Sequence, residues 1–125
     1  MIILLQSLAV GIGAFFGGAL RSLLSTVLNL SDNTYPWGTL MANIIGSCFL
    51  GIVTEAIVLS DLTSTTQLVT AIGFSGGLTT FSTFTLEVFK MFKKRNVSVG
   101  MVYWIGTVLV CLLAFVVGMF IKKVI

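Results

Sequence analysis

The chain has 125 residues, of which 57% are hydrophobic and only 9% are charged, and its formal net charge is +3. Soluble domains carry about a quarter charged residues, so this composition excludes an ordinary soluble domain and indicates an integral membrane protein. The chain has no histidine, and Cys48 and Cys111 both lie in long apolar stretches, which argues against a metal cluster or a disulfide framework. Because the basic residues flank these stretches, we interpret the charge as membrane orientation and not as nucleic-acid binding.

Four uncharged stretches follow one another along the chain, at 1–20, 33–54, 62–86 and 96–121. A bilayer-spanning helix needs roughly 20 apolar residues, so each stretch is long enough to cross a membrane. The N-terminus has no basic region before its apolar run and no convincing cleavage site, so we do not interpret it as a signal peptide. We therefore predict an all-α membrane protein in which residues 1–125 form a single four-span transmembrane domain.

The predicted spans are approximately Ile2–Leu28, Trp37–Leu59, Thr66–Phe92 and Val97–Ile121. In the first span, Gly13 and Gly17 form a GxxxG pattern, which is typical of helices that pack closely together. The spacing predicts tight packing and nothing more specific.

The third span contains an unusual run from Gly73 to Glu87. Gly76 and Gly77 weaken a helix interior, and the hydroxyl side chains that follow can take over backbone hydrogen bonds. These hydroxyl residues are Thr79, Thr80, Ser82, Thr83 and Thr85. A broken helix is tolerated in a bilayer only where protein or a water-filled cavity covers it, and transporters place ion sites at such breaks. We therefore predict that the third span is broken near mid-membrane and is the working part of the protein.

Counting residues from the span ends brings Asn43 close to the aromatic pair Phe81 and Phe84. Asn43 lies about 10 Å from the start of the second span, and the phenylalanines lie roughly 10–17 Å from the end of the third. Because these spans start on opposite faces, all three residues fall in the same leaflet. Asn43 could coordinate an anion or form an interhelical hydrogen bond, and the ring edges could contact an anion or simply pack.

Charged residues near the span ends allow two hypotheses. Arg21 and Glu87 fall near the same membrane face, so they either form an ion pair or extend separately to the interface. The loops after the first and third spans hold five basic residues against two at the other face, which predicts that both termini lie outside. The five are Arg21, Lys90, Lys93, Lys94 and Arg95, and the two are Lys122 and Lys123.

Taken together, these motifs resemble the Fluc/CrcB family of fluoride channels over essentially the whole chain. The matching segments are Gly17-Gly18-Ala19-Leu20-Arg21, Gly38-Thr39-Leu40 with Asn43 and Gly46, and Gly76–Phe84 followed by Glu87. The resemblance implies a multi-pass cell-membrane or inner-membrane ion channel, not an enzyme, that exports fluoride passively and lowers its toxicity. It also implies an antiparallel, dual-topology homodimer surrounded by membrane lipid, with two pores and no organic cofactor.

The resemblance also assigns roles to residues. It implies that the fluoride pore is lined by Asn43, Phe81, Phe84, Ser82, Thr83, Thr39 and Thr107. It implies a structural Na⁺ bound by the backbone carbonyls of Gly76 and Thr79 from both subunits. From their position near one membrane face, we also expect structural roles for Arg21 and Glu87. The family often has a polar track along the fourth span, whereas here the corresponding residues are Thr107, Cys111 and Phe115, of which only Thr107 is clearly polar.

Three alternatives remain open at this point. The charge bias is larger than dual topology suggests, so the partner could be a homologous second subunit instead of an identical copy. A small multidrug exporter also has four short spans, but it is expected to hold a carboxylate deep in the first span, where this chain has none. An accessory membrane subunit would have no transport activity of its own.

Overall fold

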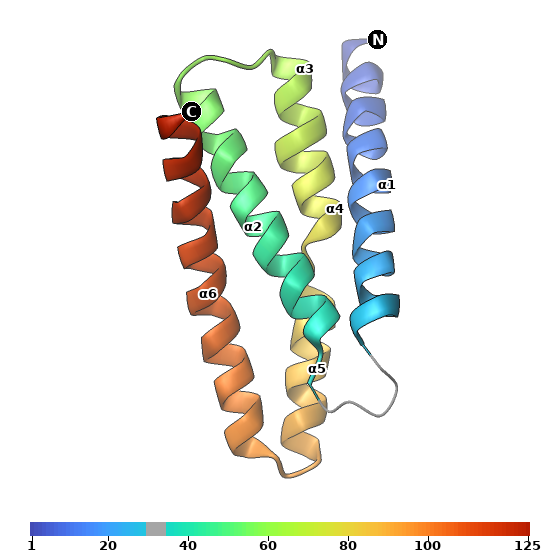
Figure 1. Ribbon diagram of the computed structural model, residues 1–125. Helices are drawn as coiled ribbons and strands as arrows, with labels where there is room; N and C mark the ends of the chain where they lie inside the picture. Colours follow the sequence, from blue (N-terminus) through green and yellow to red (C-terminus); the bar gives the residue numbers. More distant parts are fainter. Residues whose placement is uncertain (30–34) are drawn as a thin grey trace.

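The computed structural model describes residues 1–29 and 35–125, which form three long apolar helices and, third along the chain, a helical segment that is interrupted. The first, second and fourth are single helices: α1 (Ile2–Leu28), α2 (Trp37–Val58) and α6 (Val97–Val124). Each is long and apolar enough to cross a membrane. Both termini lie at the same end of the molecule (Figure 1). The predicted boundaries of these three spans are confirmed to within three residues.

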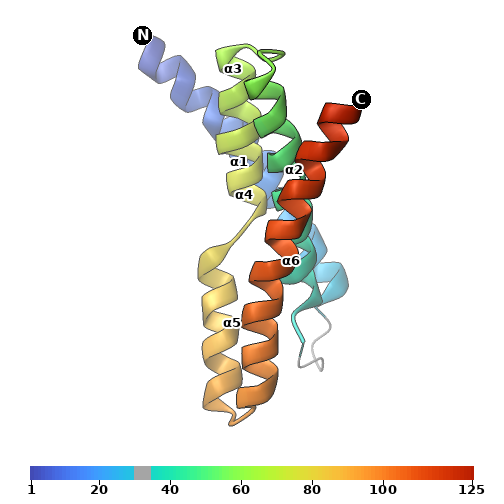
Figure 2. The same cartoon turned by 90° about the vertical axis from the view of Figure 1, so that its left-hand side faces the viewer.

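The third span is broken, as predicted. It consists of α3 (Ser64–Gln67), the π-helical segment η1 (Leu68–Ser75), α4 (Gly76–Leu78) and α5 (Phe81–Lys93). Between α4 and α5, Thr79 and Thr80 adopt extended backbone conformations, with ψ of 153° and 121°. Figure 2 shows the chain leaving the helical path at this point before α5 begins.

The break lies at the threonine pair and not at the neighbouring glycines, which remain helical. Gly77 instead permits close packing, since a Cβ there would lie 2.5 Å from the backbone oxygen of Ala14. A Cβ on Gly76 would meet nothing within 4 Å, so that residue faces open space. Gly77 therefore lets the third span pack closely on α1, whereas the side of the helix that carries Gly76 is not covered by the described chain.

The predicted GxxxG pattern of α1 packs against the third span. A Cβ on Gly13 would clash with the backbone of Val69 and of Phe74, and a Cβ on Gly17 would clash with the backbone of Phe74. Gly73 and Gly77 repeat the same spacing on the other side of this contact. Small residues on both segments thus bring two backbones together, which is how helices associate tightly in lipid.

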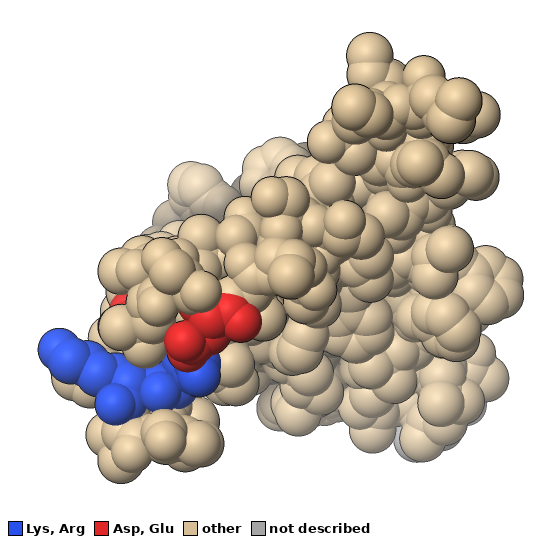
Figure 3. Space-filling view, turned by 90° about the horizontal axis from the view of Figure 1, so that it is seen from above, with Lys and Arg blue, Asp and Glu red and all other residues tan. Residues whose placement is uncertain are grey.

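The most extensive helix contact is between α2 and α6, which run in the same direction (Figure 1). Glycines again permit the approach, because a Cβ on Gly51 would clash with the backbone of Phe115, and one on Gly118 with that of Cys48. At the end that carries the termini, charged side chains gather at one edge of the face shown in Figure 3. There Lys122 Nζ lies 2.9 Å from Asp61 Oδ2.

Candidate functional site: a broken span closed by an asparagine

Asn43 of α2 binds the backbone of the break directly. Its Oδ1 accepts a hydrogen bond from Thr80 N–H at 2.8 Å, and its Nδ2 donates to Thr80 C=O at 3.2 Å. The Thr80 hydroxyl in turn accepts a hydrogen bond from Thr83 N–H at 3.2 Å and so caps the start of α5. The predicted proximity of Asn43 to the aromatic segment is confirmed, and the interhelical hydrogen bond is formed.

Two backbone carbonyls lose their helical partners because of these contacts. In an α-helix, Gly76 C=O would accept from Thr80 N–H and Thr79 C=O from Thr83 N–H. Asn43 and the Thr80 hydroxyl take those two donors instead. The residues that the resemblance assigns to the cation site therefore carry carbonyls that the fold leaves available at a helix end.

The two phenylalanines lie in different surroundings. Phe84 is 4% exposed and packs on Tyr103 with ring centroids 5.3 Å apart, whereas Phe81 is 79% exposed. Their own centroids are 6.1 Å apart at an interplanar angle of 50°. Together with Val88 and Trp104 they line an open groove of about 270 Å³ on the α5–α6 side. The structure thus brings the pair together at the mouth of a groove.

Ser82 and Thr83 are also exposed, on the turn that carries Phe81. Thr107 of α6 is 4% exposed, and its hydroxyl oxygen has no hydrogen-bond partner within residues 1–29 and 35–125. A buried hydroxyl normally finds a partner, so an unpaired one calls for an explanation such as an ion or water. Thr107 is therefore the member of the predicted pore set whose polar group is buried and still available.

Glu87 of α5 is held by two hydroxyl groups from neighbouring helices. Its Oε1 accepts from Thr39 Oγ1 of α2 at 2.7 Å, and its Oε2 accepts from Tyr103 Oη of α6 at 2.8 Å. The hypothesis of an Arg21–Glu87 ion pair is wrong, because no such pair forms between these two described residues and the carboxylate faces α2 and α6. Thr39, which the resemblance places in the pore, has its hydroxyl committed to this carboxylate.

Sequence reasoning missed Tyr103, although a signal for it exists. Tyr103, Thr107 and Cys111 follow one another at intervals of four residues, which places them on one face of α6. Of these three, Tyr103 donates to Glu87 of α5, and Thr107 is buried with its hydroxyl unpaired within the described residues. This face of α6 therefore carries a polar or thiol side chain on each of three successive turns, beginning with the residue that binds Glu87.

The family model and the relatives that match this chain all point to the same family. Residues 8–119 match the family model described as CrcB-like protein, Camphor Resistance (CrcB). A protein of Clostridium perfringens named fluoride-specific ion channel FluC is 42% identical over 100 residues, covering 78% of this chain and 77% of its own length. The fluoride-specific ion channel FluC of Ruminiclostridium cellulolyticum is 35% identical over 124 residues, covering 98% of this chain and 95% of its own.

A third relative, from Bordetella avium and also named fluoride-specific ion channel FluC, is 45% identical over 89 residues, or 70% of this chain and 69% of its own length. The family is one of membrane channels and not of enzymes. The chain, in which an asparagine of the second span closes the broken third span, therefore belongs to the CrcB/FluC family of fluoride-specific ion channels.

Proposed function

We propose that this chain forms a fluoride-selective channel that lets fluoride leave the cytoplasm passively and so lowers its toxicity. The observation that carries the proposal is the extended pair Thr79–Thr80, closed by Asn43 within the third span. Lipid excludes non-helical backbone unless protein or a water-filled cavity covers it, and broken helices at this depth are where transporters place ion sites. The relatives named as fluoride-specific channels point to fluoride as the ion.

Fluoride is strongly hydrated, so its pore must replace water with several weak donors that still release it. Asn43 can supply one, because only one of its two amide hydrogens is used by Thr80 C=O. The unpaired hydroxyl of Thr107 can supply another. The edges of Phe81 and Phe84, which carry partial positive charge, complete the contact with the ion, and Ser82 and Thr83 line the same path.

Thr39 contributes differently in this proposal. Its hydroxyl donates to Glu87, as does that of Tyr103, so both hold the carboxylate in place. A carboxylate fixed by two donors presents less negative charge to a passing anion than a free one. Thr39 and Tyr103 therefore position Glu87, and Thr39 does not line the pore with its hydroxyl.

The functional unit in this proposal is an antiparallel homodimer with dual topology. Phe81, Ser82 and Thr83 are exposed near the middle of the third span, where lipid cannot satisfy hydroxyl groups, so a second copy is expected to cover them. The break divides its span into two arms of similar length, so an inverted copy brings its own break to the same depth. A homologous second subunit could replace the identical copy without changing this geometry.

A structural Na⁺ fits the carbonyls at the break. The oxygens of Gly76 and Thr79 lack their helical donors, and Gly76 faces open space where a second copy can approach. Hard cations prefer oxygen ligands, including backbone carbonyls at broken helices. One chain supplies a half-set of ligands and the inverted copy supplies the other. When bound, the cation would add a positive charge near the pores without any ionised side chain.

The test is fluoride efflux from liposomes that contain only this purified chain, with chloride efflux as the control. Rapid release of fluoride with chloride retained is expected. Cross-linking in the same liposomes should give a dimer as the largest species. A well-folded chain that releases no fluoride contradicts the homodimer channel. Recovery of fluoride flux on addition of a homologous second chain would then establish a heterodimer. If flux does not recover, the remaining hypothesis is an accessory subunit without transport activity.

A further inference from the structure

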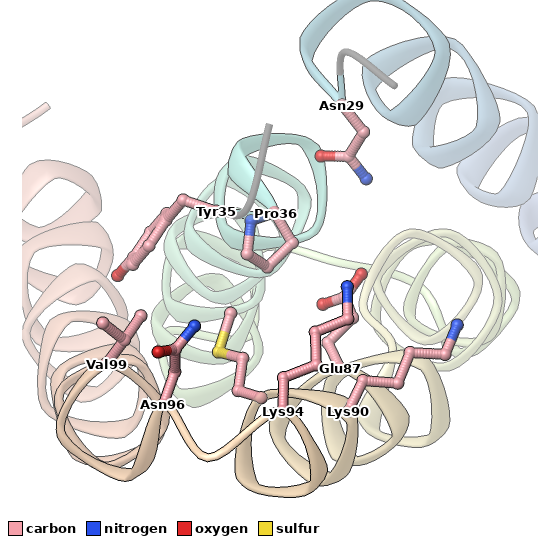
Figure 4. A pocket seen from close by; sticks show the side chains of 9 residues that line it. Asn29, Tyr35, Pro36, Glu87, Lys90, Lys94, Asn96 and Val99 are labelled. Atoms are coloured by element: carbon pink, nitrogen blue, oxygen red, sulfur yellow. The ribbon is translucent and has the colours of Figure 1, made fainter. Parts of the chain in front are cut away.

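At the membrane face opposite the termini, a cavity of about 270 Å³ lies between the loop ends of α1 and α2 and the α5–α6 hairpin. Figure 4 shows Lys94 extending among the lining side chains from the end of α5, Lys90 extending outward from α5, and Asn96 on the α6 side. Its lining residues are Asn29, Tyr35, Pro36, Glu87, Lys90, Met91, Lys94, Asn96 and Val99. The cavity therefore combines two ammonium groups, one carboxylate, amide groups and an apolar wall.

The cavity lies at the depth of the lipid headgroups. The helix α6 has 28 residues, so it is about 42 Å long and exceeds the roughly 30 Å hydrocarbon core. Its first residues therefore extend into the headgroup region, as Lys122 and Lys123 do at its other end. Asn96 and Val99 stand at this start, directly beside the last turn of α5 with Lys90.

The two lysines form no ion pair in the described part of the chain. Neither Lys90 nor Lys94 lies within ion-pair distance of a carboxylate in residues 1–29 and 35–125. Glu87 lines the same cavity one helical turn from Lys90, so its charge offsets part of the positive charge there. Its carboxylate oxygens accept from Thr39 and Tyr103.

We infer that this cavity binds the phosphate group of an anionic membrane lipid, with phosphatidylglycerol as the representative headgroup. Lys90 and Lys94 contact the phosphate oxygens, and the Asn96 amide, which lines the same cavity, donates to the headgroup hydroxyls. The apolar wall of Pro36, Met91 and Val99 accommodates the first carbons of the lipid. Basic residues at the membrane surface attract anionic lipids, and here two of them line one cavity.

The chain offers a matched control on the same turn. Lys93 and Arg95 are exposed and carry the same charge at the same depth, but they do not line the cavity. The double variant Lys90→Gln/Lys94→Gln removes the cavity charges, and Lys93→Gln/Arg95→Gln removes two neighbouring ones. If the cavity binds the lipid, only the first pair of substitutions weakens binding. Lys90→Arg/Lys94→Arg keeps the charge and should keep the binding.

The experiment is native mass spectrometry of the full chain in detergent, titrated with phosphatidylglycerol or with phosphatidylcholine. We expect preferential retention of phosphatidylglycerol and a fall of about ten-fold in its apparent affinity for the Lys90/Lys94 variant, with the control variant unchanged. Equal loss in both variants would show a diffuse basic surface and overturn the proposal. Since lipid retention is read directly, the result does not depend on fluoride transport.

Inorganic phosphate separates the lipid from a free anion. Thermal unfolding is measured with 10 mM phosphate alone and with phosphatidylglycerol alone. Stabilisation by the lipid that requires Lys90 and Lys94, with no such shift from phosphate, supports the lipid site. If phosphate alone gives the same lysine-dependent shift, the cavity binds free phosphate and the lipid assignment is wrong.

Discussion

Asn43 and Thr80 are joined by two hydrogen bonds, so a side chain of the second span completes the backbone of the third. The amide oxygen accepts from Thr80 N–H at 2.8 Å and the amide nitrogen donates to Thr80 C=O at 3.2 Å. Asn43 is 7% exposed and Thr80 is also 7% exposed, so water cannot easily replace either bond. The break therefore persists only while a side chain with both a donor and an acceptor faces it.

Replacing Asn43 tests this relationship. Asn43→Ala leaves Thr80 N–H and C=O unpaired, at a cost of about 1–3 kcal/mol for each buried group. Asn43→Asp keeps the acceptor and loses the donor, so its loss of stability should be intermediate. Thermal unfolding in detergent measures the order, and fluoride efflux should be abolished in Asn43→Ala. Equal stability of all three proteins would show that the two bonds contribute nothing.

Substitutions of Phe81 and Phe84 should affect stability and fluoride efflux to different extents. Phe84 is buried against Tyr103, so Phe84→Ile should destabilise each chain by about 1–3 kcal/mol. Phe81 is 79% exposed within one chain, so Phe81→Ile should leave the chain folded within about 0.5 kcal/mol and still abolish fluoride efflux. Efflux and thermal unfolding are measured on both variants. Unchanged fluoride flux in Phe81→Ile would show that the Phe81 ring does not line the pore.

Gly17 and Gly18 form a matched pair for the packing of α1. A methyl group on Gly17 would meet the Phe74 carbonyl and lie 2.8 Å from Leu78 N, whereas one on Gly18 would meet nothing within 4 Å. Gly17→Ala should therefore lower the free energy of unfolding by about 1–3 kcal/mol or more, because it forces the backbones apart. Gly18→Ala should be neutral or slightly stabilising. Both are compared by thermal unfolding, and equal effects would contradict the described contact.

The hydroxyl donors of Glu87 can be removed one at a time. Tyr103→Phe and Thr39→Val each leave one carboxylate oxygen without its donor, at about 1.5–3 kcal/mol for a hydrogen bond to a charged group. In a Glu87→Gln background each substitution should cost less, because the hydrogen bond no longer goes to a charged group. Thermal unfolding of this set measures the coupling. Losses of the same size with and without Glu87→Gln would show that the two hydroxyl groups act independently of Glu87.

Removal of Na⁺ should affect assembly and flux together. If the carbonyls of Gly76 and Thr79 bind the cation, exchange of Na⁺ for N-methylglucamine during purification should weaken the dimer and abolish fluoride efflux. Restoring Na⁺ should restore both, measured by cross-linking and by efflux. Li⁺ and K⁺ serve as size controls. An active dimer after thorough exchange would contradict a required Na⁺ site.

Much of this architecture follows from composition and local pattern. The low charge and the four long uncharged stretches indicate four helical spans, because a single apolar segment of about 20 residues satisfies its own backbone groups in lipid only as a helix. The hydroxyl-rich run after Gly77 determines that the third span is interrupted. The count of residues between span ends also determines that Asn43 and Phe81 lie at similar depth. Each of these results depends on length, hydropathy or spacing along one segment.

The tertiary structure decided which partner each polar group takes. Nothing in the local pattern distinguishes Thr39 or Tyr103 from Arg21 as the partner of Glu87, because the choice depends on how α2 and α6 pack against α5. The break likewise falls at Thr79–Thr80 because Asn43 reaches that point from another helix. Hydrogen bonds between spans depend on distances across the bundle, and spacing along the chain does not contain those distances.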